Sequence, residues 1–127
     1  MFRRIAAAGA AALALGLGLT APAAQAHHSY AMFDRSKTVT LNGTIRQFQW
    51  TNPHSWIQLT TPNDAGGTDE WSIEMGSPFE LLRVGWTSST VKAGDKVSIQ
   101  IHPVKDGSKG GGFVSGTDAG GRPLGGK

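Results

Sequence analysis

Hydrophobic residues alternate with polar residues over much of the chain after position 37. Val39, Leu41 and Ile45 share one parity and polar residues hold the other, which is the period of two expected for a half-buried strand. Gly43 interrupts the run, and the apolar parity then shifts to Phe48. A glycine inside a strand usually marks a bulge or a bend. The pattern therefore predicts a long first strand that bends near Gly43.

Three further segments, at residues 55–60, 70–75 and 97–102, show the same alternation. A turn at residues 51–54, which contains a proline, precedes the first of them, and clusters of Asn, Asp and Gly bound the others. Phe113 and Val114 would form a short last strand. The glycines that follow Lys109 fit a flexible loop better than an anion-binding loop, because no strand and helix bracket them.

One short helix is predicted between the third and fourth strands. Ser77 stands at the cap position, a proline follows at the first helical position, and a glutamate lies three residues after the cap. Gly85 ends the pattern, so the helix should span Pro78–Val84. The residues expected to face the core are Phe79, Leu82 and, less strongly, Leu81.

Three strands, a helix and two strands follow the order of the OB-fold, a small five-stranded Greek-key barrel. We therefore predict an all-β fold with one short helix. A β-sandwich is the alternative, but it would need about seven strands. The expected organisation is an export signal at residues 1–26, an N-terminal segment at 27–37, an OB-like barrel at 38–116 and a glycine-rich tail at 117–127.

The first 26 residues have the three parts of a secretory signal. Met1–Arg4 is positively charged, Ile5–Leu19 is apolar, and Ala24-Gln25-Ala26 is a small-x-small cleavage site. The apolar run is shorter than the roughly 20 residues of a membrane span, so no span should remain after cleavage. We expect His27 to become the amino terminus and the bacterial periplasm, or secretion, to be the destination.

Charge and composition narrow the function classes. The formal net charge is +3, and removing the two arginines of the signal leaves a charge of about +1. The basic residues are scattered, so nucleic acid is not an expected partner. Cysteine is absent from the sequence, which removes disulfides and thiolate metal sites. No recognisable catalytic motif is present, and we lean against an enzyme.

The four histidines, His27, His28, His54 and His102, are the best candidates for chemistry. A free amino-terminal histidine can chelate Cu(II) through its amine and its ring Nδ1, and a further imidazole can complete a nitrogen-rich plane. His27 would form the chelate, with His54 or His102 as the third nitrogen ligand. His28 is the competitor and would give a terminal site independent of the fold. Alternatively, the histidines are ordinary surface and turn residues.

The tryptophans suggest a second, metal-free function. Trp50 and Trp71 share parity with core residues, whereas Trp56 lies opposite its aliphatic neighbours and should be the more exposed ring. The loop after the first strand would then present Trp50, Asn52 and Trp56 to a sugar, a peptide or a partner protein.

Several short motifs carry a family resemblance across nearly the whole mature chain. The sequence resembles exported bacterial proteins of the domain of unknown function 6152. The resemblance implies an exported, small, β-rich domain, and it brings no activity with it. The motifs are His27-His28-Ser29-Tyr30, Trp50-Thr51-Asn52-Pro53-His54-Ser55-Trp56, Glu74-Met75-Gly76-Ser77-Pro78, Gly85-Trp86-Thr87, Lys92-Ala93-Gly94-Asp95 and Lys105-Asp106-Gly107-Ser108.

Three functions remain open, in this order. The first is a periplasmic Cu(II)-binding chaperone or buffer. The second is a metal-free OB-like interaction module with a periplasmic partner. The third is a copper-dependent oxidase, which ranks last because no general acid, general base or substrate groove can be assigned.

Overall fold

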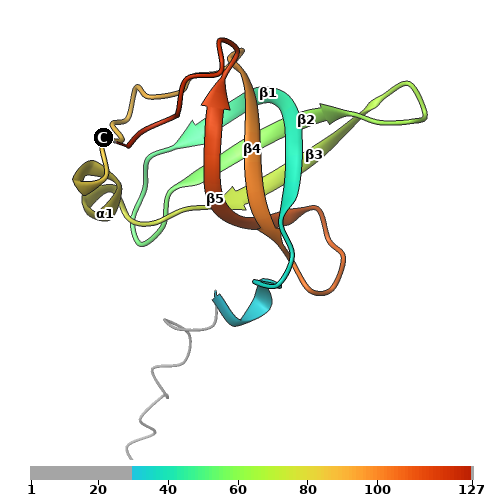
Figure 1. Ribbon diagram of the computed structural model, residues 1–127, viewed down its shortest axis with the longest axis horizontal. Helices are drawn as coiled ribbons and strands as arrows, with labels where there is room; N and C mark the ends of the chain where they lie inside the picture. Colours follow the sequence, from blue (N-terminus) through green and yellow to red (C-terminus); the bar gives the residue numbers. More distant parts are fainter. Residues whose placement is uncertain (1–29, 127) are drawn as a thin grey trace, which may run out of the picture.

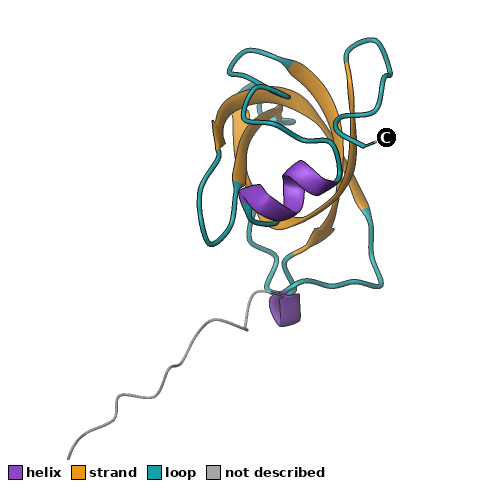
Figure 2. Cartoon of the chain, turned by 90° about the vertical axis from the view of Figure 1, so that its left-hand side faces the viewer, coloured by secondary structure: helices purple, strands orange, loops and turns teal. Residues whose placement is uncertain are grey.

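The fold is a five-stranded barrel with one helix across an open end (Figures 1 and 2). The computed structural model describes residues 30–126. The predicted export signal therefore lies outside the described residues, as do His27 and His28. The elements are the 3₁₀ turn η1 (Tyr30–Met32), β1 (Val39–Gln49), β2 (Trp56–Pro62), β3 (Thr68–Glu74), α1 (Pro78–Arg83), β4 (Lys96–Pro103) and β5 (Gly110–Asp118).

The barrel closes in the order β1-β2-β3-β5-β4, with β4 returning to β1. The three leading strands form the predicted antiparallel meander, and β3 and β5 are the parallel pair that closes the barrel. This is the OB arrangement, so the predicted fold class is confirmed and the sandwich alternative is wrong. No helix within residues 30–126 is long and apolar enough to cross a membrane.

The bend in β1 lies three residues later than predicted. The register between β1 and β2 shifts between Ile45 and Gln47, so Arg46 is the extra residue of the bulge. Gly43 is paired regularly with Val97 of β4. A glycine is required at position 43 for another reason, because a Cβ atom there would collide with the carbonyl oxygen of Thr60.

The core is the barrel interior, and strand alternation fills it as predicted. Ile57, Leu59, Ile73, Ile99 and Ile101 are fully buried. Their neighbours on each strand point outward, as the period of two requires. The parities predicted for β2, β3 and β4 are therefore confirmed.

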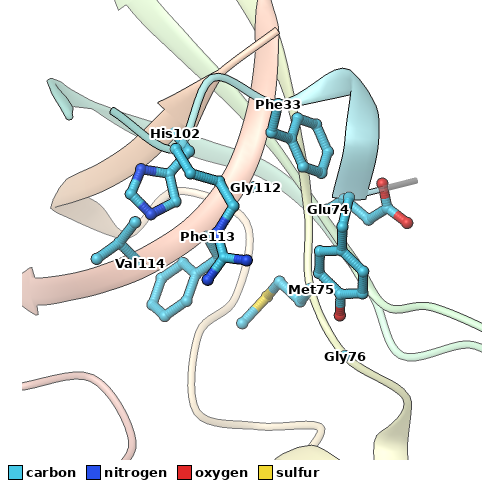
Figure 3. Close-up of a pocket in the computed structure, with 10 residues that line it drawn as sticks. Phe33, Glu74, Met75, Gly76, His102, Gly112, Phe113 and Val114 are labelled. Carbon is cyan, nitrogen blue, oxygen red and sulfur yellow. The ribbon is translucent and has the colours of Figure 1, made fainter. Parts of the chain in front are cut away.

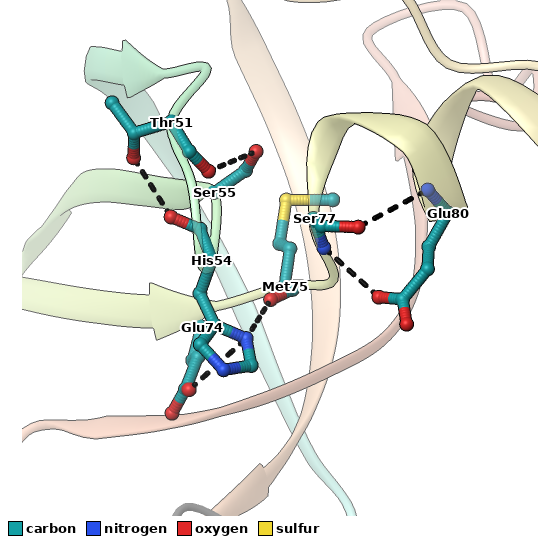
Figure 4. A network of polar contacts seen from close by, with 7 residues as sticks. All are labelled: Thr51, His54, Ser55, Glu74, Met75, Ser77 and Glu80. Carbon is teal, nitrogen blue, oxygen red and sulfur yellow. Dashed lines mark hydrogen bonds and ion pairs between the residues drawn. The ribbon is translucent and has the colours of Figure 1, made fainter. Parts of the chain in front are cut away.

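Helix α1 begins as the sequence predicts but buries a different side. Ser77 Oγ accepts from the backbone N–H of Glu80 at 3.2 Å, and the Glu80 carboxylate accepts from the backbone N–H of Ser77 at 2.9 Å, which completes the capping box (Figure 4). The helix spans only six residues, so one residue, Leu81, reaches the core. The expectation that Phe79 and Leu82 face the core is wrong: they are 69% and 55% exposed.

Trp86, rather than a second helical residue, fills the barrel end beside Leu81. Gly85, with φ of +89°, reverses the chain after α1, and Trp86 is 3% exposed. Its ring stacks on Phe48 at a centroid distance of 5.8 Å and meets Phe113 edge-on at 5.4 Å. The ring of Trp50 also stacks on Phe48, at a centroid distance of 5.7 Å. A continuous aromatic cluster therefore closes this end.

The glycine run after Lys109 is part of a strand, so the prediction of a flexible loop is wrong. Gly110, Gly111 and Gly112 pair in parallel with residues 72–74 of β3, and Gly111 and Gly112 pair on the other side with β4. A Cβ atom on Gly111 would lie 2.7 Å from the Cδ1 atom of Ile101. The glycines are there because neighbouring atoms leave no room for side chains.

The glycine-rich tail folds back onto the barrel. β5 runs to Asp118, two residues beyond the predicted end of the barrel domain. Leu124 packs against the core and donates its N–H to Gly116 O at 2.9 Å, and Gly126 donates to Val84 O at 2.6 Å. The tail thus adds to the closure around Trp86.

Candidate functional site

Four residues form a row across the outer face of the barrel. Trp56 of β2 pairs with Glu74 of β3, Glu74 pairs with Gly112 of β5, and Gly112 pairs with His102 of β4. Residues directly paired on neighbouring strands point to the same face. Strand spacing places the Cα atoms of Glu74 and His102 about 10 Å apart, with a residue that has no side chain between them.

The gap over Gly112 holds Phe33. Phe33 is 5% exposed, and a Cβ atom on Gly112 would lie 3.0 Å from its ring. Backbone pairing with the segment after β4 fixes this position: Phe33 bridges to Val104, and Asp34 N–H donates to Pro103 O at 2.8 Å. Because Gly112 has no side chain, the Phe33 ring of the N-terminal segment can pack against β5 at this position.

Phe33 is the buried residue at the start of the described chain. The neighbouring large side chains are exposed, Tyr30 to 63% and Met32 to 43%. The segment is also stiffened by Asp34, which accepts hydrogen bonds from the Ser36 hydroxyl at 2.6 Å and the Ser36 N–H at 3.0 Å. These bonds, with nearby Lys37, hold the pKa of Asp34 below its usual value.

A cleft of about 520 Å³ opens beside this segment (Figure 3). Its walls come from η1, the end of β3, the end of β4 and the middle of β5. His102 lies on one side of Phe33 and Gly112, and Glu74 lies on the other (Figure 3). The lining residues are Tyr30, Phe33, Arg35, Glu74, Met75, Gly76, His102, Gly112, Phe113 and Val114.

His102 is fixed by a backbone carbonyl. Its Nδ1 lies 2.8 Å from Lys37 O, and because a carbonyl oxygen only accepts, Nδ1 carries the proton in this bond. The Nε2 atom of the neutral ring then holds the free lone pair. Histidines that bind metals usually have this arrangement, with the other ring nitrogen donating to a carbonyl or carboxylate.

His54 is tied to the end of β3 in the same way (Figure 4). Its Nδ1 lies 3.0 Å from Met75 O and 3.4 Å from the Glu74 carboxylate oxygen Oε1. Glu74 is only 8% exposed, so this carboxylate is held in a largely dry position on the outer face of the barrel. His54 therefore fixes the turn before β2 against the end of β3, and it does not line the cleft.

The two histidines that the structure describes do not build a complete metal site. No group of three or more His, Asp or Glu residues positioned to hold a metal ion occurs between Tyr30 and Gly126. His27 and His28, the predicted terminal ligands, lie outside that range. The fold by itself offers single imidazoles at His54 and His102.

The loop residues predicted to bind a partner lie in different surroundings. Trp50 is half-buried in the aromatic cluster, Asn52 is exposed in the turn, and Trp56 is half-buried on the outer face. Trp71 is half-buried as well, with its indole N–H donating to Thr61 Oγ1 at 3.1 Å, so Trp56 does not stand out by exposure. Trp56 instead lines a small pocket of about 180 Å³ with Glu74.

Sequence reasoning missed the residues that shape the cleft. Glu74 lies on the polar parity of its strand, so alternation predicts an exposed side chain, yet Glu74 is only 8% exposed. Gly112 was assigned to a loop, and Arg35 shows no pattern in the sequence. The one available signal was the run of three glycines, which marks a place where another part of the chain approaches closely.

Comparison with known proteins identifies the family. A family model matches residues 16–113. The chain belongs to the family of unknown function DUF6152. The predicted resemblance is thus confirmed, and the description of the family names no activity. A search of curated proteins found no match.

One solved structure is similar to this chain. It is the mitochondrial single-stranded DNA-binding protein Rim1 of S. cerevisiae, with a TM-score of 0.46 and 14% sequence identity over 72% of this chain and 97% of that one. DNA binding is a property of Rim1. For this DUF6152 protein, the expectation of no nucleic-acid partner stays a prediction.

Proposed function

We propose that this DUF6152 protein is an exported Cu(II)-binding protein, acting as a chaperone or a buffer. Its mature terminus would supply the amine and the ring Nδ1 of His27, and His102 Nε2 would supply the third nitrogen. The observation that carries the proposal is that His102 and Tyr30 line the same cleft. Tyr30 lies three residues after the predicted terminus.

Chain length supports this choice of ligands. Three residues span at most about 10 Å, so the proposed terminal amine of His27 would be able to reach the cleft that Tyr30 lines. Backbone pairing with β4 and the buried Phe33 hold the chain just after Tyr30. His102 is thus favoured over His54, which does not line this cleft.

The donor set suits Cu(II) because amine and imidazole nitrogens favour a tetragonal site. The hydrogen bond from His102 Nδ1 to Lys37 O leaves Nε2 as the ligand and fixes the ring orientation before any metal arrives. Protons compete for the same nitrogens, so copper affinity should fall as the pH drops below about 6.5, the reference pKa of imidazole.

The decisive experiment compares mature protein that begins at His27 with a variant carrying one extra alanine before it. Cu(II) binding is measured by competition titration, and electron paramagnetic resonance reports the nitrogen ligands. The extension keeps every side chain but moves the terminal amine out of the chelate, so affinity should fall at least tenfold. His102→Ala should weaken binding to a similar degree.

His54→Ala and His28→Ala are the controls. His54→Ala should leave copper affinity unchanged within twofold in protein that remains folded. Loss confined to His28→Ala would indicate a terminal peptide site that does not use the barrel. Equal affinity in the native, alanine-extended and His102→Ala proteins would overturn the proposal. The intact mass of the exported protein should correspond to a chain that begins at His27. A different first residue would remove the proposed amine chelate.

A further inference from the structure

We propose a second binding site in this protein: the cleft beside Phe33 takes a small zwitterion with an apolar side chain, namely an α-amino acid. Glu74 would bind the ammonium group, Arg35 would bind the carboxylate, and the apolar wall would cover the side chain. This site requires no metal, so it does not depend on the proposed copper function.

Glu74 is the first reason. Its side chain is 8% exposed, and the one polar contact recorded for its carboxylate within residues 30–126 is His54 Nδ1, 3.4 Å from Oε1. The proton on that nitrogen is directed to Met75 O, which is closer at 3.0 Å. No fully buried side-chain oxygen in the described part of the chain lacks a partner, so Oε2 keeps some exposure, and Glu74 lines both this cleft and the small pocket beside Trp56. A carboxylate removed from water in this way is costly unless a cation pairs with it.

Arg35 is the second reason. It lines the same cleft but forms no ion pair with any residue that the structure describes, Glu74 included. Its planar guanidinium is suited to bidentate contact with a carboxylate. Two opposite charges therefore face one cavity without neutralising each other, and a ligand that carries both charges can bridge them.

The other residues that line the cleft select the side chain of the amino acid. The side chains of Phe33, Met75, Phe113 and Val114 are apolar, and Gly76 and Gly112 add no bulk. The volume of about 520 Å³ falls within the usual range of small-molecule sites, roughly 300–1,000 Å³. An aromatic or aliphatic side chain would cover these surfaces while its ammonium lies near the rings of Phe33 and Tyr30.

Other ligand classes fit less well. A simple amine would satisfy Glu74 but lie close to the positive Arg35. A simple carboxylate would have the opposite problem, and a neutral apolar molecule would desolvate both charges without a partner for either. The arrangement thus favours a zwitterion over an ion of one sign.

The test is isothermal titration calorimetry on the full mature protein at pH 7 with a chelator present. The probes are L-phenylalanine, L-leucine and L-methionine, with 2-phenylethylamine and 3-phenylpropionate as single-charge controls. At least one amino acid should bind saturably, and each control should bind at least tenfold more weakly than that amino acid. No saturable binding of the three amino acids, or equal binding of the controls, would overturn the proposal.

Matched variants locate the site. Glu74→Gln and Arg35→Gln should each weaken amino-acid binding at least tenfold. Arg46 and Glu70 form an exposed ion pair at 3.4 Å away from the cleft, so Arg46→Gln and Glu70→Gln should leave it unchanged. Unchanged binding in both cleft variants would overturn the proposal. The single-charge probes test it on the native protein even if Glu74→Gln unfolds.

The alanine-extended protein separates the two proposals. It should lose copper affinity and keep amino-acid binding, because the zwitterion site uses no terminal nitrogen. Loss of amino-acid binding in this variant, with its fold intact, would count against the second site alone.

Discussion

Large side chains fill the end of the barrel closed by α1, whereas glycines open the outer face between β3 and β4. At the first place, Leu81, Trp86 and the aromatic cluster pack together, and the returning tail is bonded beside them. At the second, the Phe33 ring occupies the space over Gly112, and a cleft remains beside it.

The polar groups of the two regions differ in the same sense. The polar groups at the start of α1 satisfy one another through the capping box. Around the cleft beside Phe33, His102 keeps a free ring nitrogen, Glu74 has a single contact at 3.4 Å with His54, and Arg35 forms no ion pair within the described chain. Complete packing serves stability, and incomplete packing leaves groups available to bind. The predictions below test this division, from the largest effect to the smallest.

Trp86→Ala should be the most destabilising single substitution. It removes a ring that is 3% exposed and contacts both Phe48 and Phe113, and such truncations cost about 3–5 kcal/mol. Urea denaturation measures the loss, and Trp86→Phe should recover part of it. A cost under about 1 kcal/mol would show that this end of the barrel is not the stabilising one.

Leu81→Ala and Leu82→Ala should separate the two sides of α1. Leu81 is 7% exposed and Leu82 is 55% exposed. The first change should cost about 2–3 kcal/mol and the second about 0.5 kcal/mol or less, because only Leu81 leaves a cavity. Thermal unfolding of the two variants is a direct comparison, and equal costs would contradict the observed helix orientation.

Gly112→Val should impair binding at the cleft more than it lowers the stability of the barrel. The new side chain would collide with the Phe33 ring, and overpacking of this kind costs about 1–3 kcal/mol. Displacing Phe33 also releases the segment that leads to the terminus, so copper affinity should fall although His102 is unchanged. Denaturation and copper titration measure the two effects.

Gly67→Ala is the matched glycine control. Gly67 has no close neighbours, since the nearest atoms to a new Cβ would be those of Asn63 at 3.7 Å, and its φ is not positive. Restricting the unfolded chain should stabilise the protein by about 0.4–1 kcal/mol with copper affinity unchanged. Similar losses in both glycine variants would mean that Gly112 has no special role.

Acid should destabilise the turns of the protein, and this should be the smallest of the predicted effects. Hydrogen bonds from neighbours in the same turn lower the pKa of Asp34, Asp95, Asp106 and Asp118 below the model-compound value of 3.8. A lowered folded-state pKa adds stability above pH 3.8 that is lost as the pH falls through the lower value. The urea midpoint of metal-free protein should therefore decline below about pH 4. Asp34→Asn should make that decline shallower.

The fold followed from the sequence because its signals are local. Alternation at Ile57 and Leu59, and at Ile99 and Ile101, assigns strands and their inner faces without knowledge of their partners. Ser77 and Glu80 start α1 through bonds within four residues. His102 lies on the outer face of its strand, opposite the buried Ile101, and parity alone decides that side.

The candidate site needed the tertiary structure because its residues are brought together by pairing between distant strands. The parallel pairing of β5 with β3 places Gly112 between Glu74 and His102, and no local pattern specifies it. The same holds for Glu74, which alternation would expose and which the folded chain buries, and for the side of α1 that is buried. By itself, the sequence determined β2, β3 and β4 and their inner faces. Only the closed barrel decided which outer residues meet, because each strand's pattern records its own burial and not the identity of its neighbour.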